Sequence, residues 1–154
     1  MKIYLVQHGE AVAKDVDPDR PLSDQGRKDI EKMAAFLESA GIRAGQILHS
    51  GKTRAQQTAE ILAEKLLDGD RIKSVPGINP NDPVQAFAEG INDWSADTMV
   101  VGHLPFMARL VSWLLAGQDE VALVTYTPGS VAYLEQDDHT NWSLQWMLRP
   151  ELVQ

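Results

Sequence analysis

The chain has 154 residues, 44% of them hydrophobic, and a formal net charge of −8. A chain of this length is typical of one domain, which buries about 70% of the surface that the unfolded chain exposes. The acidic balance repels nucleic acid, so we expect no nucleic-acid partner. The absence of cysteine excludes disulfides, thiolate metal sites and a cysteine nucleophile. Any covalent catalysis must therefore use histidine, serine, threonine or a carboxylate.

Residues 2–6 form a short apolar run near the N-terminus, and this run stops at His8-Gly9. Its composition predicts a buried strand that ends at a turn. The run is too short for the core of a signal peptide or for a membrane span. We therefore expect a cytoplasmic protein that has no membrane partner.

Two amphipathic helices are predicted in the first half of the chain. The first begins after Ser23, a good N-cap, and ends at Gly41, a residue type that commonly follows a helix. A short strand is expected over Gln46–His49, and a second helix from about residue 52 to residue 67. Arg54 therefore lies in the first turns of the second helix.

The second half of the chain alternates strands and helices and ends in a hairpin. The expected segments are a strand over 71–75, a turn-rich loop over 76–83, a helix over 83–90, a strand over 98–102, a helix after residues 103–105, and hairpin strands over 130–135 and 142–149. Alternation in the last strand predicts that Trp142, Leu144, Trp146 and Leu148 share one face. This order predicts an α/β fold, a three-layer α/β/α sandwich around a mainly parallel mixed sheet with an antiparallel edge hairpin.

Side chains suited to catalysis follow three of the predicted strands. His8 follows the first strand, Ser50 and Arg54 follow the second, and His103 follows the strand over 98–102. Because ligands bind at the carboxyl ends of strands in open α/β sheets, we expect these residues to meet in one pocket. A lone histidine-glycine pair after a strand is usually only a turn. The matching segments around Arg54 and His103 are what favour a catalytic role for His8.

Four segments of the chain, in order, resemble the motifs of the histidine phosphatase superfamily. LVQHGEA at 5–11 resembles its RHG signature, SGKTRAQQTAE at 50–60 its second-arginine segment, and VVGHLP at 100–105 its second-histidine segment. The stretch 19–23, followed by Gly26, is similar to the R-P-L-[ST]-x-x-G stretch of the SixA-like phosphohistidine phosphatases. The resemblance spans most of the chain and implies a phosphatase.

The resemblance implies a two-step phosphoryl transfer with His8 as the nucleophile. A neutral imidazole attacks phosphorus in line, and water then hydrolyses the phosphohistidine enzyme. The transition state spreads negative charge over three oxygens. Arg54, His103 and Arg20 are expected to stabilise that charge.

The remaining contacts are also implied by the resemblance. The expected substrate-binding residues are Gln7, Arg20, Ser50 and Gly9. Many members of the superfamily use a carboxylate from the region after the second helix as the general acid, and this chain offers Asp82 and, further on, Glu89 there. Asp82 is the candidate general acid. A phosphohistidine substrate leaves as an imidazole that is itself readily protonated, so a dedicated acid is dispensable. No metal-binding spacing or nucleotide-binding fingerprint occurs, and we expect no metal and no cofactor.

The first motif departs from the superfamily at Gln7, where the superfamily has arginine. An amide keeps hydrogen bonding but loses the charge and the fork geometry of a guanidinium. Three outcomes stay open. The chain is a working phosphatase that uses Arg20 and Arg54, a slow enzyme, or a non-catalytic relative that binds phosphate or phosphohistidine.

The stretch between residues 58 and 99 is short and leaves little room for a lid subdomain. We therefore expect residues 1–154 to form a single histidine-phosphatase-like domain with an open pocket. Such a pocket suits a phosphoryl group on a protein surface, and the expected partner is a phosphorylated histidine phosphotransfer domain in signal transduction. The alternative enzyme is a small-molecule phosphomonoesterase of the same superfamily, acting on a small phosphate ester.

Overall fold

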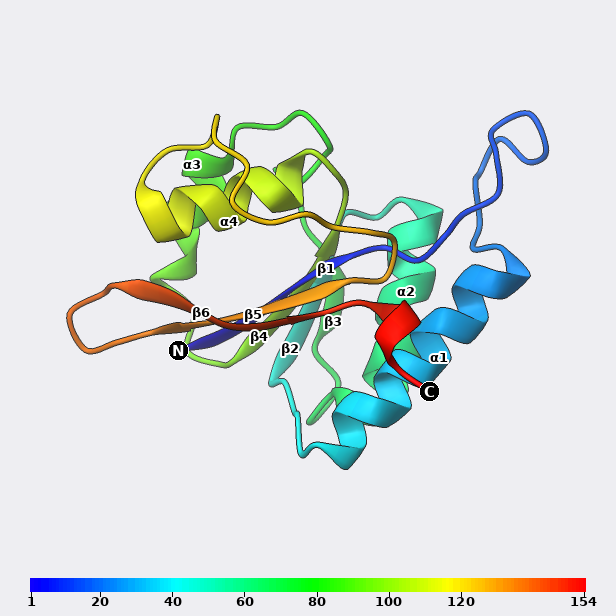
Figure 1. The fold of residues 1–154 in the computed structure, drawn as a ribbon, viewed down its shortest axis with the longest axis horizontal. Coiled ribbons are helices and arrows are strands. Elements are labelled where there is room, and N and C mark those ends of the chain that lie inside the picture. The colour runs from blue at the N-terminus through cyan, green and yellow to red at the C-terminus, as the bar shows by residue number, and fades with distance from the viewer.

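Six strands form one mixed sheet in the order β3-β2-β4-β1-β5-β6 in the computed structural model, which describes residues 1–154 (Figure 1). The strands are β1 (Lys2–Gln7), β2 (Gln46–His49), β3 (Ile72–Ser74), β4 (Thr98–Gly102), β5 (Val131–Gln136) and β6 (Trp142–Leu148). β1, β2, β3 and β4 pair in parallel, whereas β5 and β6 pair antiparallel at one edge. The carboxyl ends of β1, β2, β3 and β4 therefore meet at one edge of the sheet.

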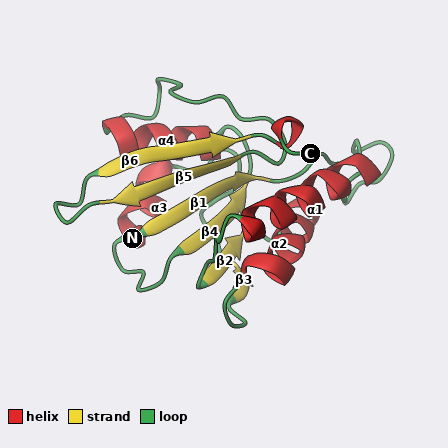
Figure 2. Cartoon of the chain, turned by 60° about the horizontal axis from the view of Figure 1, so that its bottom comes forward, coloured by secondary structure: helices red, strands yellow, loops and turns green.

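The helices cover both faces of the sheet (Figures 1 and 2). They are α1 (Asp24–Ser39), α2 (Thr53–Leu66), α3 (Val84–Ile91), α4 (Phe106–Ala116) and the short 3-10 helix η1 (Pro150–Leu152). α1 and α2 enclose one hydrophobic cluster, and α3 and α4 enclose the other. This confirms the predicted three-layer sandwich. None of these helices has the length and apolar character needed to cross a bilayer.

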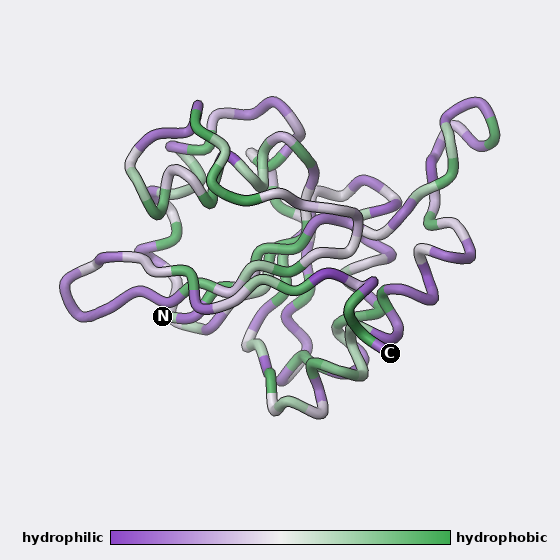
Figure 3. The backbone as a smooth tube through the Cα atoms, viewed as in Figure 1, coloured by the Kyte–Doolittle hydropathy of each residue, from purple (hydrophilic) through white to green (hydrophobic).

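Hydrophobic residues are concentrated along the central strands, and the β5–β6 turn is hydrophilic (Figure 3). β1 alternates between the two clusters, with Tyr4 and Val6 in the α1–α2 cluster and Ile3 and Leu5 in the α3–α4 cluster. A strand that is buried on both faces explains why the N-terminal run is apolar throughout.

α1 begins and ends where the sequence predicts. Ser23 accepts a hydrogen bond from the N–H of Gly26, and Gly41 takes a φ of 81° just beyond the helix. Gly26 also has a packing role, because a Cβ there would lie 2.0 Å from the carbonyl oxygen of Glu10. The glycine lets the chain that follows β1 cross the first turn of α1, where the N–H of Ser23 donates to the Glu10 carbonyl at 2.9 Å.

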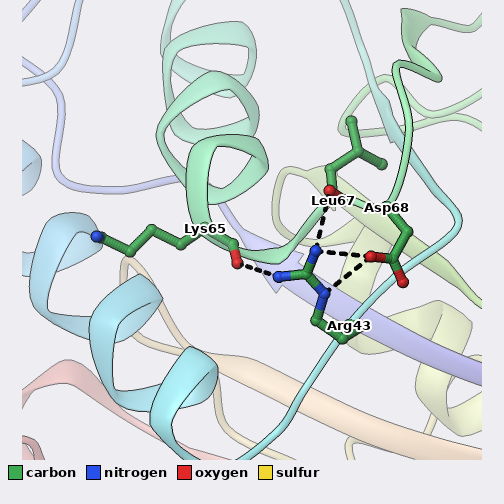
Figure 4. A network of polar contacts seen from close by, with 4 residues as sticks. All are labelled: Arg43, Lys65, Leu67 and Asp68. Carbon is green, nitrogen blue, oxygen red and sulfur yellow. Dashed lines mark hydrogen bonds and ion pairs between the residues drawn. The ribbon is translucent and has the colours of Figure 1, made fainter.

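The carboxyl end of α2 is held by Arg43 (Figure 4). The guanidinium donates to the carbonyl oxygens of Lys65 at 2.8 Å and Leu67 at 3.5 Å, and to Asp68 Oδ1 at 2.6 Å from Nη2. A cation at the carboxyl end of a helix is also favoured by the helix dipole. This network lies where β2 begins, at the end of the sheet opposite its carboxyl edge.

The predicted alternation in the last strand is wrong. The register between β5 and β6 shifts between Tyr133 and Leu134, so that Trp146 pairs with Tyr133 whereas Leu144 pairs with Leu134. A bulge exchanges the two faces of a strand beyond it. Trp146 and Leu148 consequently pack on the α1–α2 cluster, Trp142 packs on the α3–α4 cluster, and Leu144 stays 38% exposed.

Candidate active site

His8 stands at the carboxyl end of β1, and three separate parts of the chain hold its backbone. Its N–H donates to the Gly102 carbonyl at 3.0 Å, and its carbonyl accepts from the N–H of Gly129 at 3.1 Å. The next N–H, that of Gly9, donates to Thr58 Oγ1 on α2 at 3.0 Å. His8 is therefore fixed by β4, by the turn before β5 and by α2.

The imidazole of His8 has a defined orientation. Nδ1 lies 2.7 Å from the Gly9 carbonyl oxygen, so Nδ1 carries the proton and Nε2 keeps its lone pair. Burial, reinforced by the charges of Arg54 and Arg20, lowers the pKa of His8 from 6.5 to about 4, against the opposing effect of the Gly9 hydrogen bond. Near pH 7 the imidazole is therefore neutral, and the residue is only 9% exposed.

His103 lies directly against His8, with the two ring centroids 5.0 Å apart. It is 1% exposed, and its Nδ1 is buried without a hydrogen-bond partner. Burial, followed by the charges of neighbouring groups that include His8, Arg54 and Lys52, lowers the pKa of His103 from 6.5 to about 3. A neutral His103 can still donate one hydrogen bond.

Ser50 decides which nitrogen of His103 makes that donation. Its Oγ lies 2.6 Å from His103 Nε2 and accepts a hydrogen bond from the Lys52 N–H at 3.3 Å. With an N–H already directed at Oγ, the hydroxyl proton of Ser50 is available to donate to Nε2. That assignment, made from the network, leaves the proton of His103 on Nδ1. The site then holds a buried N–H donor that no protein group satisfies.

Arg54 is the second residue of α2, and its Nε is also buried without a partner. The first turn of α2 contains no acidic residue and no side-chain cap, whereas α1 has both in Asp24 and Ser23. Burial and the charge of Arg20 lower the pKa of Arg54. A cation at the amino end of a helix is disfavoured by the helix dipole, so an anion is the natural partner for this group.

Arg20 reaches the same region from the loop between β1 and α1. Its charge contributes to the lowered pKa values of His8, Arg54 and His103, which places the guanidinium near all three. Its Nε donates to the Val12 carbonyl at 3.1 Å, and its φ is 47°. Arginine rarely adopts this left-handed conformation, and such strain is concentrated at functional sites.

Gln7 is 7% exposed, and its Oε1 is buried without a partner. Its backbone is well satisfied, because its N–H donates to Ser130 and its carbonyl accepts from Gly129. Together with Arg54 Nε and His103 Nδ1, it accounts for all the buried side-chain polar atoms that have no partner. Gln7 is the last residue of β1, and Arg54 lies in the first turn of α2, which follows β2. His103 follows β4, the strand that lies between β1 and β2 in the sheet.

The structure thus brings His8, His103, Arg54 and Ser50 together, as the positions at the strand ends predict, and the charge of Arg20, on the loop after β1, acts on the same groups. Ser50 contacts His103 directly. The N–H of Gly9 is engaged by Thr58, and its carbonyl by His8. No three His, Asp or Glu side chains are grouped so that they could hold a metal ion.

Asp82 occupies a different position. Its Oδ2 accepts from the Asn79 N–H at 2.8 Å, and the residue lines a cavity of about 500 Å³ with Pro76, Phe87 and Trp94 among others. Asp82 is not among the charges that perturb the pKa of His8 or His103. Its role as a general acid stays a prediction.

Sequence reasoning missed two residues of α2 that support the site. Thr58 accepts from the Gly9 N–H and donates to the Arg54 carbonyl at 2.8 Å, and Gln57 Oε1 accepts from the Leu22 N–H at 2.8 Å. Their distance from Arg54 in the sequence could have indicated this role. Residues three and four positions beyond Arg54 lie on the same helix face as Arg54.

Comparison with known proteins agrees with this geometry. A family model of the histidine phosphatase superfamily (branch 1) matches residues 3–78, which include His8, Arg20 and Arg54. Phosphohistidine phosphatase SixA of Escherichia coli is 27% identical over 156 residues, covering 97% of this chain and 94% of that protein. An uncharacterised protein of Picosynechococcus is 32% identical over 125 residues, covering 77% and 75% of the two chains.

Solved structures show the same fold. A structure of the protein histidine phosphatase SixA complexed with tungstate has a TM-score of 0.86 at 25% identity and covers 99% of both chains. A putative alpha-ribazole-5'-P phosphatase from Escherichia coli shares the fold at a TM-score of 0.79 and 16% identity, over 97% of both chains. The likeness to SixA in sequence and in fold supports phosphatase activity, and the chain belongs to the histidine phosphatase superfamily.

Proposed function

We propose that the chain removes the phosphoryl group from phosphohistidine on a signalling protein, through a covalent phospho-His8 intermediate. The observation that carries the proposal is the arrangement around His8. A neutral imidazole with its Nε2 lone pair free lies beside His103 Nδ1 and Arg54 Nε, two buried donors that lack a protein partner. A phosphoryl group supplies the acceptor oxygens that these donors need.

The transfer proceeds in two steps. The lone pair of His8 Nε2 forms a P–N bond while the P–N bond to the substrate imidazole breaks, and the leaving nitrogen takes up a proton. Water then attacks phosphorus, the bond to His8 breaks, and inorganic phosphate leaves with the neutral imidazole restored. The Gly9 carbonyl accepts from His8 Nδ1–H throughout and stabilises the positive charge that develops on the ring.

Three groups stabilise the phosphoryl oxygens in this proposal. Arg54 and Arg20 supply positive charge in a chain whose net charge is −8, and His103 Nδ1–H supplies a neutral donor. Because these groups are held before substrate arrives, they need little reorganisation in the transition state. Gln7 adds an amide but no charge to the same pocket.

The protein-borne substrate is supported by the region between α2 and β4. Its one helix, α3, packs into the α3–α4 cluster through Val84, Ala88 and Ile91. No helix of this region is left over to close on the pocket. The similarity to SixA, a phosphohistidine phosphatase, supports the same substrate class.

Asp82 is our candidate for protonating a leaving group that needs an acid. It is half-buried, and its Oδ2 accepts a hydrogen bond from the Asn79 N–H. Because an imidazole leaving group is readily protonated by solvent, Asp82→Asn should leave phosphohistidine hydrolysis within about threefold of wild type. The same variant should slow hydrolysis of an alkyl phosphate by about 10²-fold, the usual contribution of a general acid.

The experiment that tests the function compares three readouts on the purified chain. These are hydrolysis of a phosphohistidine-bearing protein, hydrolysis of p-nitrophenyl phosphate, and binding of orthophosphate. We expect faster turnover of the phosphoprotein. Preference for the small ester would instead indicate a phosphomonoesterase. Orthophosphate binding without turnover of either substrate would indicate a binding relative, the alternative that Gln7 leaves open.

A further inference from the structure

Gln57 connects α2 to the loop that carries Arg20. Its Oε1 accepts a hydrogen bond from the N–H of Leu22 at 2.8 Å, two residues after Arg20. Gln57 lies three residues beyond Arg54 and therefore on the same face of α2. One face of this helix thus presents one arginine of the pocket and contacts the segment that supplies the other.

Apart from this bond, the Arg20 loop is attached to the body of the protein near its base, where the buried Leu22 packs in the α1–α2 cluster and pairs with Ala11. It extends away from the sheet between β1 and α1 (Figure 1), and its residues 13–16 are exposed. The Val12 N–H donates to the Pro21 carbonyl at 2.9 Å, which closes the loop on itself. The Ser23 N–H donates to Glu10 at 2.9 Å, which ties the loop base to the end of β1. Neither of these two hydrogen bonds reaches α2.

The strained backbone of Arg20 needs such an attachment. A φ of 47° is costly for a residue with a Cβ, and it persists only where the surroundings over-determine it. Within the loop, Arg20 donates its N–H to Asp17 at 3.0 Å and its Nε to Val12 at 3.1 Å. These bonds set the conformation of the loop. The Gln57–Leu22 bond is a hydrogen bond that joins the end of this loop to α2, the helix that carries Arg54.

We propose that Gln57 is a positioning residue, which holds Arg20 at the distance from Arg54 at which both guanidinium groups engage one phosphoryl group. The inference rests on the proposed function, which assigns Arg20 to the phosphoryl oxygens. Gln57 itself touches neither substrate nor His8 in this account. Its effect on anion binding passes through Arg20 and vanishes when Arg20 is absent.

A double-mutant cycle tests this dependence. Gln57→Met keeps the length of the side chain and removes the acceptor, and Gln57→Asn keeps the amide but is too short to reach Leu22. The matched control is Gln56→Met, because Gln56 is exposed on the same turn and bonds only to Glu60. Each change is made with Arg20 and with Arg20→Ala, and each protein is checked for folding by its thermal unfolding midpoint.

The readouts are the dissociation constant of orthophosphate and the kcat/KM for a phosphohistidine protein. Arg20→Ala should weaken phosphate binding about tenfold to a hundredfold, the range for losing one charge-assisted hydrogen bond. Gln57→Met and Gln57→Asn should each weaken it about threefold to tenfold when Arg20 is present, and should have no effect in the Arg20→Ala background. Gln56→Met should be silent in both backgrounds.

Equal losses from the Gln57 changes in both backgrounds would overturn the inference, because Gln57 would then act on the fold or on Arg54. Unchanged phosphate affinity in folded Gln57 variants would overturn it as well. Failure of the proposed function looks different. In that case the wild-type chain itself does not turn over the phosphoprotein, whether or not it binds orthophosphate.

Discussion

Arg43 and Arg54 lie at opposite ends of α2 and behave in opposite ways. At the carboxyl end, Arg43 is 46% exposed and has its nitrogens bonded to two carbonyl oxygens and to Asp68. At the amino end, Arg54 has a buried Nε without a partner, and the helix dipole disfavours its charge. The arginine at the carboxyl end has its hydrogen-bond partners within the chain, whereas the Nε of Arg54 at the amino end lacks one.

This difference separates structural charges from functional ones. An arginine that donates hydrogen bonds to helix carbonyl oxygens and to a carboxylate stabilises the folded state. An arginine that is half-buried, with an unpartnered Nε and with Arg20 nearby, weakens it, because desolvation and repulsion are not offset. In the proposed function Arg54 is retained for the phosphoryl group that it binds, and stability is often sacrificed at functional sites in this way.

The largest expected effect comes from exchanging each arginine for alanine. Arg54→Ala should lower kcat/KM about 10²- to 10³-fold, the usual cost of one preorganised donor to the reacting group. Without phosphate, its thermal midpoint should equal or exceed that of wild type. Arg43→Ala should lower the thermal midpoint and leave kcat/KM unchanged. Equal activity losses in both variants would abolish the distinction between the two ends.

The second prediction concerns stability against acid. His8 and His103 are neutral in the fold, with pKa values of about 4 and about 3, whereas an unfolded histidine has its ordinary value of 6.5. The unfolded chain therefore binds more protons below pH 6.5, and stability is fully present above that pH and is lost as pH falls toward 4. Each histidine adds up to about 1.4 kcal/mol per pH unit to this loss.

Urea denaturation at a series of pH values measures this slope. His8→Ala and His103→Ala should each flatten it between pH 6.5 and 4, and saturating orthophosphate should raise stability at every pH. A slope that neither substitution changes would show that the two histidines are not the source of the acid sensitivity.

Removing the hydroxyl of Ser50 should have a smaller effect. Ser50→Ala frees His103 Nε2, so the proton is no longer kept on Nδ1 and part of the population presents a lone pair to the phosphoryl group. We expect kcat/KM to fall about tenfold, close to the cost of one hydrogen bond at a charged partner. Nitrogen-15 shifts of His103 report the tautomer. An unchanged Nδ1–H tautomer in Ser50→Ala would exclude this role.

The smallest effect, a gain, is expected at Gln7. Gln7→Arg adds charge to a pocket that already holds Arg54 and Arg20, so the gain in kcat/KM should stay below about tenfold, less than the full value of one donor. The buried Oε1 leaves little room for a longer side chain. The double variant with Arg20→Ala should recover part of the Arg20→Ala loss, and no recovery would show that the two positions serve different oxygens.

Local signals predicted most of the fold. The bounds of β2 and β4 agree with the sequence prediction, and α1 begins and ends at its predicted caps, because strand composition and caps act within a few residues. The β5–β6 bulge was not predicted, since it depends on the pairing of two strands and not on either one.

The candidate site was predictable to a similar degree. His8, His103 and Arg54 follow from strand ends and motif resemblance, because the topology alone brings such positions together. The partners of Ser50, Gln57 and Thr58 could not be predicted in this way. Ser50 meets a residue 53 positions away, Gln57 one 35 positions away and Thr58 one 49 positions away, and only the folded chain brings these pairs within hydrogen-bond distance.

The covalent step is tested most directly by trapping the intermediate. The wild-type chain and His8→Ala are mixed with a phosphohistidine protein that carries radiolabelled phosphate, quenched within one turnover in base, and separated from the substrate. The account predicts base-stable, acid-labile label on the wild-type chain, mapped to His8 by mass spectrometry, and neither label nor turnover in His8→Ala. Turnover by His8→Ala at the wild-type rate would contradict the account, because water would then attack the substrate directly.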